Sequence, residues 1–179
     1  MKKKILAVLM AAAMVFGMTA CGGTSNDAGS AAAGGDAAGS GAIGLAVSTQ
    51  NNPFFVTLVE GAQKAADAAG VKLVVTDAGD DAAKQTNDVD DLISKKVSVL
   101  IVNPVDSDAI APAVEDAIAA GIKVIAVDRA VNGVDVDCQI ASDNVKGAEM
   151  ATEYLKSVIG DGAKVAELQG TTGASATID

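Results

Sequence analysis

The chain has 179 residues, half of them hydrophobic, which is enough for one complete domain of ordinary size and the beginning of another. It contains no histidine, so no imidazole is present for metal binding, acid–base catalysis or a Ser-His nucleophile. The net charge of −10 argues against nucleic acid as a partner, because a phosphate backbone is bound through a basic surface. Composition therefore disfavours most hydrolases, zinc enzymes and nucleic-acid-binding proteins.

The N-terminus has the pattern of an export signal. Three lysines precede an apolar run, Ile5 to Ala20, that is shorter than a comfortable membrane span and ends in small residues. Residues 1–20 are therefore predicted to be a signal peptide. Its removal takes away three lysines and no acid, so ten cations face 23 acids and the exported chain has a net charge of −13.

Cys21 directly follows the predicted cleavage site. The stretch Met18-Thr19-Ala20-Cys21 resembles the lipobox of bacterial lipoproteins, whose cysteine carries the lipid. The alternatives are a free thiol or a disulfide with Cys138, the only other cysteine. We favour a lipid anchor as the single membrane contact, which places the exported protein in the periplasm or at the outer face of the cytoplasmic membrane.

Residues 22–41 are rich in glycine, alanine and serine and carry no large apolar side chain. Such a segment buries too little surface to offset the entropy lost on ordering, so residues 21–41 are predicted to be a lipid-anchored flexible linker. A Gly-rich coil of this length has a root-mean-square span of roughly 25 Å. The linker would keep a globular body close to the membrane.

From Ala42 onward, short β-branched runs alternate with longer stretches of helical period. The predicted strands are Ile43–Val47, Val71–Val75, Val97–Val102 and Ile122–Val127. Because they are apolar at nearly every position and separated by helical segments, they imply a parallel sheet that is covered on both faces. The predicted fold class is a doubly wound α/β layer.

Three helices are predicted between these strands. In the first, Asn52 suits the N-cap, Pro53 the first turn and Gly70 the C-terminal end. The third is predicted over Ser107 to Ala120, with Pro112 bending it early. The predicted apolar stripes are Phe55, Leu58, Ala62, Ala65 and Ala69 in the first helix, and Ala83, Thr86, Val89 and Ile93 in the second.

Polar and aromatic side chains follow the predicted strands at their carboxyl ends, where open α/β sheets bind ligands. They are Ser48 to Phe55, Asp77, Asn103 to Asp108, and the pair Asp128 and Arg129. Planar carboxylate, amide and guanidinium groups make paired hydrogen bonds to adjacent hydroxyls, while flat rings cover the apolar face of a sugar. This rim predicts a site for a polyhydroxylated ligand, with no metal, cofactor or catalytic residue.

Most of these residues also have a purely structural interpretation. Phe55 could belong to the core, Asn52 could be only an N-cap, and Arg129 could be a surface cation paired with Asp128. The expected structural residues are Asp106 and Asp108 as caps, the run from Asp77 to Asp81 as a solvated loop with a cation site as its alternative, and Cys138, Met150 and Tyr154 as packing residues.

Five segments together resemble the ribose-type periplasmic sugar-binding proteins, the substrate-capturing components of ABC importers. They are Val47–Phe55, Ile101–Ala109, Val127–Arg129, Ile140–Asn144 and Glu167–Gly170. The resemblance implies a type I periplasmic-binding-protein fold with two lobes that close over one sugar. Residues 42–142 would form the N-terminal sugar-binding lobe, and residues 143–179 the hinge crossing and an incomplete second lobe.

The resemblance also implies roles for individual residues. Asn52, Asp128 and Arg129 would hydrogen-bond the sugar, Phe54 and Phe55 would line or stack on its ring, and Ser48 and Asn103 would support the pocket. The helix Val145–Ile159 and a strand Lys164–Leu168 would begin the second lobe. An arginine that the family carries shortly after the segment matching Gly173–Ala176 has no counterpart here, so we expect the sequence to be part of a longer chain that binds sugar weakly or not at all at this length.

The leading prediction is a non-enzymatic receptor that captures ribose or a similar monosaccharide outside the cell and delivers it to an ABC permease in the membrane. A ligand sensor for a chemoreceptor or kinase would have the same pocket, and only its partner would differ. A nucleotide-dependent enzyme is disfavoured because the loop Ser48–Phe55 contains no glycine to cradle a phosphate. A transcription repressor is disfavoured by the export signal and by the lack of a basic DNA-binding headpiece.

Overall fold

The computed structural model describes residues 41–178. The predicted signal peptide, Cys21 and nearly all of the predicted linker lie outside the described residues, so they stay predictions. Within residues 41–178, no helix combines the length and the apolar character needed to cross a bilayer.

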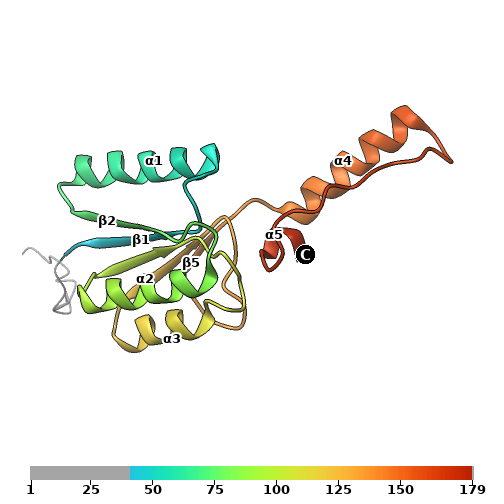
Figure 1. Cartoon of the computed structure of the whole chain (residues 1–179). Helices are drawn as coiled ribbons and strands as arrows, with labels where there is room; N and C mark the ends of the chain where they lie inside the picture. Colours follow the sequence, from blue (N-terminus) through green and yellow to red (C-terminus); the bar gives the residue numbers. More distant parts are fainter. Residues whose placement is uncertain (1–40, 179) are drawn as a thin grey trace, which may run out of the picture. The chain divides into compact units, whose positions relative to one another are not determined.

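Five parallel strands form one sheet in the order β2-β1-β3-β4-β5 (Figure 1). The strands are β1 (Ile43–Val47), β2 (Leu73–Asp77), β3 (Val99–Val102), β4 (Lys123–Val127) and β5 (Cys138–Ile140). In the register of β1, which pairs with β2 on one side and with β3 on the other, Leu45 lies opposite Val75 and Ile101. The strand order reverses between β1 and β3, and ligands bind beyond the carboxyl ends of strands at such a switch point.

Helices cover both faces of the sheet. The helices of the described chain are α1 (Pro53–Ala69), α2 (Ala82–Ser94), α3 (Ala111–Ala119), α4 (Asn144–Ile159) and the short α5 (Ser175–Ile178), of which α1, α2 and α3 pack on the sheet. Figure 1 shows α1 on one face of the sheet, and α2 and α3 together on the other. The doubly wound parallel α/β layer predicted from the sequence is confirmed.

The first helix begins and ends as the sequence predicts. The Asn52 side chain accepts a hydrogen bond from the Phe54 N–H at 3.0 Å, and Pro53 occupies the first turn, where its missing N–H is not needed. At the other end Gly70 adopts a φ of +67°, the left-handed conformation that terminates many helices. The cap at Asn52 fixes where Phe54 and Phe55 enter the helix.

The principal core lies between the sheet and the pair α2 and α3. It is built from aliphatic side chains, among which Val89, Leu92 and Leu100 are buried almost completely. At Gly44 in β1, an added Cβ would lie only 3.0 Å from a methyl group of Leu92, so α2 packs against the strand at a point where only glycine fits without a shift.

The predicted start of the third helix is wrong. The helix begins at Ala111 rather than at Ser107, and Pro112 therefore lies in its first turn and bends nothing. The Asp106 carboxylate accepts hydrogen bonds from the N–H groups of Asp108 and Ala109, so it caps a separate turn ahead of the helix. The Asp108 side chain is not a cap, because it accepts a hydrogen bond from the Asn132 side chain at 2.8 Å instead.

The acidic segment after β2 is a loop with ordinary local hydrogen bonds. The Asp77 carboxylate accepts from the Gly79 N–H, and Asp81 caps α2 by accepting from the Lys84 N–H at 3.0 Å. Within residues 41–178, no group of three carboxylate or thiol side chains is arranged to hold a metal ion.

Predictions for the last part of the chain are partly wrong. Helix α4 is present, but the expected strand Lys164–Leu168 is not, because that segment pairs with no other strand among the described residues. The predicted packing residues are exposed: Met150 is 60% exposed, Tyr154 is 72% exposed, and Cys138 is an exposed free cysteine. No residue of α4 is buried, because no other element of the described chain covers that helix.

Candidate functional site

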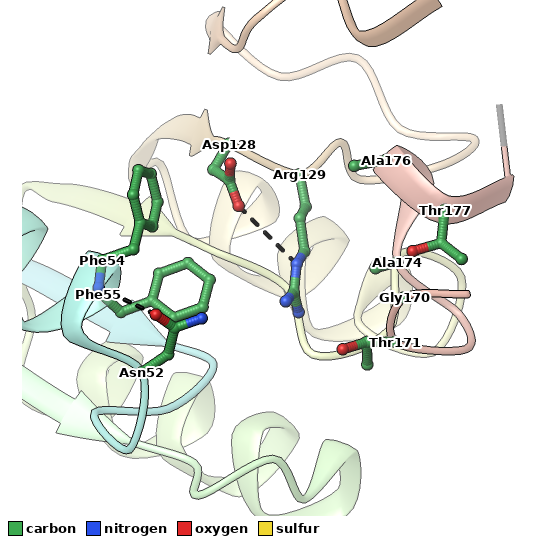
Figure 2. Close-up of a pocket in the computed structure, with 10 residues that line it drawn as sticks. All are labelled: Asn52, Phe54, Phe55, Asp128, Arg129, Gly170, Thr171, Ala174, Ala176 and Thr177. Atoms are coloured by element: carbon green, nitrogen blue, oxygen red, sulfur yellow. Dashed lines mark hydrogen bonds and ion pairs between the residues drawn. The ribbon is translucent and has the colours of Figure 1, made fainter. Parts of the chain in front are cut away.

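A cavity of about 310 Å³ lies beyond the carboxyl ends of the strands (Figure 2). Its lining residues are Asn52, Phe54, Phe55, Asp128, Arg129, Gly170, Thr171, Ala174, Ala176 and Thr177. The five residues that the sequence predicts to touch the ligand are all among them. The structure thus brings together side chains that follow β1 and β4, which are far apart in the sequence.

Asp128, which supplies a carboxylate to the cavity, lies in a strained turn. Asp128 has a φ of +66°, and the Arg129 N–H donates to the Val127 carbonyl at 2.8 Å across it. A positive φ inside such a three-residue hydrogen-bonded ring corresponds to the classic γ-turn, which is rare and strained. Successive side chains of a regular strand point to opposite faces, whereas this turn lets Asp128 and Arg129 line the same cavity.

Ser48 and Asn103 lie behind the cavity wall rather than in it. Both are fully buried, and the Ser48 hydroxyl donates to the Asn103 side-chain oxygen at 2.6 Å. The Asn103 side-chain nitrogen donates to the Val127 carbonyl at 3.1 Å and to the Asp128 carboxylate at 3.3 Å. The two side chains therefore connect the ends of β1, β3 and β4 and hold the carboxylate of Asp128 from behind.

Arg129 is held in one orientation by several partners. Its Nη1 donates to the Pro104 carbonyl at 2.8 Å, and its guanidinium carbon lies 5.3 Å from the centre of the Phe55 ring. Its Nε lies 3.8 Å from the Asp128 carboxylate, a long ion pair, and the Arg129 side chain is only 10% exposed. The interpretation as a surface cation is therefore wrong, although the pairing with Asp128 is present.

The two phenylalanines differ sharply in exposure. Phe55 is 3% exposed and packs in the core, while Phe54 is 55% exposed. Their ring centres lie 5.2 Å apart at an interplanar angle of 79°, an edge-to-face pair. Phe55 therefore forms part of both the core and the cavity wall, whereas Phe54 lines the cavity with a largely exposed ring (Figure 2).

Asn52 is both the N-cap of α1 and a residue of the cavity wall, the two roles that the sequence left open. Its side-chain oxygen serves the N-cap of α1, and the residue also lines the cavity. Among the described residues, its side-chain nitrogen has no hydrogen-bond partner, so this donor is free for a ligand.

The opposite wall comes from a segment near the C-terminal end that the sequence analysis did not assign to the site. Gly170, Thr171 and Thr177 line the cavity there, together with two alanines. The segment is attached by the Ser107 N–H, which donates to the Gly173 carbonyl at 2.8 Å, and by the Ser175 hydroxyl, which accepts from the Ala130 N–H at 2.9 Å. Small residues without charge or periodicity give no functional signal in a sequence, so only the resemblance of Glu167–Gly170 and Gly173–Ala176 to the family pointed to this region.

A parallel sheet of this order, with polar and aromatic groups around a cavity at its carboxyl edge, is the arrangement that the resemblance to periplasmic binding proteins predicts. The family model for the periplasmic binding protein domain matches residues 43–179, and the chain belongs to this family. Among its relatives is the ribose import binding protein RbsB of Bacillus subtilis, which is 53% identical over 135 residues, 75% of this chain and 44% of that protein. The Escherichia coli protein of the same name is 49% identical over 134 residues, 75% of this chain and 45% of its own length.

Solved structures give the same assignment. The Caulobacter myo-inositol binding protein superposes with a TM-score of 0.73 at 29% identity, covering 77% of this chain and 47% of that one. A solute binding protein of an ABC transporter from Mycobacterium smegmatis, with bound glycerol, superposes with a TM-score of 0.73 at 38% identity, covering 78% and 49%. The resemblance found in the sequence is confirmed, and the chain spans somewhat less than half the length of the curated relatives quoted above.

The relatives named here are binding proteins, not enzymes. The ligands in their names are ribose, myo-inositol and glycerol, all of which are polyhydroxylated. The family is named for the periplasm, to which such binding proteins of importers are exported.

Proposed function

We propose that the protein is the substrate-binding component of an ABC-type sugar importer, and that it captures ribose or a similar monosaccharide without changing it chemically. The observation that carries the proposal is the convergence of the Asp128 carboxylate, the Arg129 guanidinium and the open Phe54 ring on one cavity. Charged planar groups beside an aromatic face suit a molecule that has hydroxyls on its edge and C–H groups on its face.

Each lining group has a defined task in this proposal. The Asp128 carboxylate accepts from two adjacent hydroxyls, while Arg129 and the Asn52 side-chain nitrogen donate to ring or hydroxyl oxygens. Phe54 covers the apolar face of the ring, and Phe55 supports the guanidinium. Ser48 and Asn103 hold Asp128 in place without touching the sugar.

The size of the cavity supports a small ligand. Its volume of about 310 Å³ lies at the lower end of the range of roughly 300–1,000 Å³ found for small-molecule pockets. A wrong sugar that leaves one of the buried polar groups unpaired is rejected at a cost of about 1–3 kcal/mol for each group.

The remaining assignments follow from the same proposal. Residues 42–142 form the first lobe, and residues 143–179 form the hinge crossing and the start of a second lobe that closes over the sugar. Residues 1–20 direct export, and a lipid on Cys21 anchors the protein through the linker 21–41. The loaded protein then delivers its sugar to a membrane permease.

Calorimetric titration tests the proposal. Because the chain spans less than half of its ribose relatives, the product of the complete reading frame is titrated in parallel with the 179-residue chain. We expect the complete product to bind ribose, to bind 2-deoxyribose about tenfold or more weakly because one hydrogen-bonded hydroxyl is missing, and to release the sugar unaltered. We expect the 179-residue chain to bind weakly or not at all. No affinity of the complete product for any monosaccharide would refute the proposal.

A further inference from the structure

A buried glutamine on α2 holds the loop that follows β3. Gln85 is 1% exposed, and its side-chain nitrogen donates to the Asn103 carbonyl at 2.8 Å. Its side-chain oxygen accepts from the Val105 N–H at 2.7 Å. These two backbone groups flank Pro104, which has no N–H of its own. The glutamine amide thus pairs with the loop as a residue of a neighbouring parallel strand would.

The other side of the same loop is held by Arg129. Its Nη1 donates to the Pro104 carbonyl at 2.8 Å and approaches the Val105 carbonyl at 3.5 Å. The remaining donor, the Asn103 N–H, is taken by the Ala46 carbonyl at 2.9 Å. Every backbone polar group from Asn103 to Val105 therefore has a partner, as the burial of this loop requires.

Gln85 and Arg129 act on the two edges of one rigid unit. The Val105 N–H and the Pro104 carbonyl belong to the same peptide group, which is trans and planar, so its N–H and its C=O point in opposite directions. Gln85 holds the N–H edge and Arg129 holds the C=O edge. Rotation of this plane would turn the carbonyl away from the guanidinium, so the contact with Gln85 sets the direction of the acceptor on which Arg129 rests.

We propose that Gln85 is a positioning residue of the sugar site, which orients the Arg129 guanidinium through the peptide group between Pro104 and Val105 without touching the ligand. The ligand part of this inference rests on the proposed function. It also accounts for the residue type, because the glutamine amide offers a donor to the Asn103 carbonyl and an acceptor to the Val105 N–H, whereas a carboxylate would face that carbonyl with a second acceptor.

The first test needs no ligand. Arg129 is the only arginine in the sequence, so its guanidinium gives a single set of signals in an arginine-labelled NMR spectrum of the 179-residue chain. We expect Gln85→Leu, which keeps the volume and removes both hydrogen bonds, to speed the exchange of the guanidinium protons with water about tenfold, the equivalent of one lost hydrogen bond. The matched control is Val89→Ala, one turn further along α2 and also fully buried, which should leave this exchange unchanged.

The second test measures coupling in the complete reading-frame product. We expect Gln85→Leu to weaken ribose binding about fivefold to tenfold and Val89→Ala to leave it unchanged. In a variant that already carries Arg129→Met, Gln85→Leu should not weaken ribose binding further, because Gln85 contributes to affinity only by orienting the Arg129 guanidinium. If Gln85→Leu fails to fold, Gln85→Glu replaces it, because it keeps the acceptor for the Val105 N–H and loses the donor to the Asn103 carbonyl. We expect Gln85→Glu also to speed the exchange of the Arg129 guanidinium protons and to weaken ribose binding.

The outcomes separate the two proposals. Equal effects of the Gln85 and Val89 variants on the Arg129 signals would overturn the positioning role, as would independent effects of Gln85 and Arg129 on affinity. If no sugar binds to the complete product, the proposed function fails, and the NMR comparison still decides whether Gln85 orients the guanidinium.

Discussion

Replacing Asp128 with asparagine separates ligand binding from folding. The substitution keeps the size of the side chain, and asparagine tolerates the left-handed φ of +66° about as well as aspartate does. The Asn103 side chain, now 3.3 Å from a carboxylate oxygen, can still donate to an amide oxygen. The variant therefore removes the negative charge and leaves the turn intact.

The expected sizes of the two effects differ. In the free protein the Asp128 side chain is 33% exposed and its ion pair with Arg129 is long, at 3.8 Å, so losing the charge should change the free energy of unfolding by less than about 1 kcal/mol. Hydrogen bonds to a charged group contribute about 1.5–3 kcal/mol each, compared with about 1 kcal/mol for neutral ones. Replacing the charged acceptor of two sugar hydroxyls should therefore reduce the binding free energy by about 2–3 kcal/mol, which raises Kd about 30- to 150-fold.

Both effects are measured on the complete reading-frame product. Calorimetric titration with ribose gives the change in Kd, and unfolding in urea gives the change in the free energy of unfolding. Asp88→Asn is the matched control, because Asp88 pairs with Lys84 at 2.8 Å on α2, outside the cavity. It should leave the affinity unchanged. Retention of ribose affinity within about threefold in Asp128→Asn would contradict the reasoning, since a loss that small is below the net contribution of one hydrogen bond.

Three further predictions concern the aromatic pair, a glycine and a surface carboxylate. Phe55→Ala should lower the free energy of unfolding by about 3–5 kcal/mol, whereas Phe54→Ala should change it by less than about 0.5 kcal/mol and mainly weaken ribose binding, as urea unfolding and calorimetry will show. Gly173→Ala should reduce stability by about 1–2 kcal/mol in urea unfolding, because its φ of +85° is left-handed and a Cβ would meet a neighbouring carboxylate. The pKa of Asp137 lies below its ordinary value because the Lys123 amine and then a backbone N–H donate to the carboxylate, so NMR titration of Lys123→Met should show that pKa rising towards the ordinary range.

A control variant or an expected direction of change accompanies these predictions. Gly147 lies inside α4 with no atom within 4 Å of an added Cβ, so Gly147→Ala should stabilise the chain by about 0.5–1 kcal/mol in the same assay. Because the folded-state pKa of Asp137 is lowered, its contribution to stability is present above the ordinary pKa and is lost as the pH falls through the folded-state value. An unchanged pKa in Lys123→Met, a stability loss in Phe54→Ala as large as in Phe55→Ala, or a neutral Gly173→Ala would each contradict the corresponding contact.

Much of the fold can be predicted from the sequence because it depends on local patterns. The alternation of β-branched runs with helical stretches gives β1 to β4 and α1, and Asn52 and Gly70 mark the two ends of α1. The site follows from the topology, because parallel strands place their following loops at one edge of the sheet. This topology predicts that Phe54 and Arg129 lie on one rim, and both line the same cavity.

The remaining features depend on contacts that no local pattern encodes. Strand β5 has only three residues and is defined by its pairing with β4. The stripe of α1 passes through Ala66, not through the predicted Ala65 and Ala69, because the neighbouring β1 and β2 decide which face is buried. Gln85 reads as an exposed helix residue until β3 and its loop are placed beside α2.

The half-exposed Phe54 ring, which lines the cavity, is a suitable position for an optical probe of the protein in solution. The printed sequence contains no tryptophan, and its one tyrosine, Tyr154, lies on α4 and does not line the cavity. An indole in place of the Phe54 ring, 55% exposed, would be the only tryptophan chromophore in the chain. Its emission would report on the surroundings of the cavity, with Tyr154 as the one other strong fluorophore among these 179 residues.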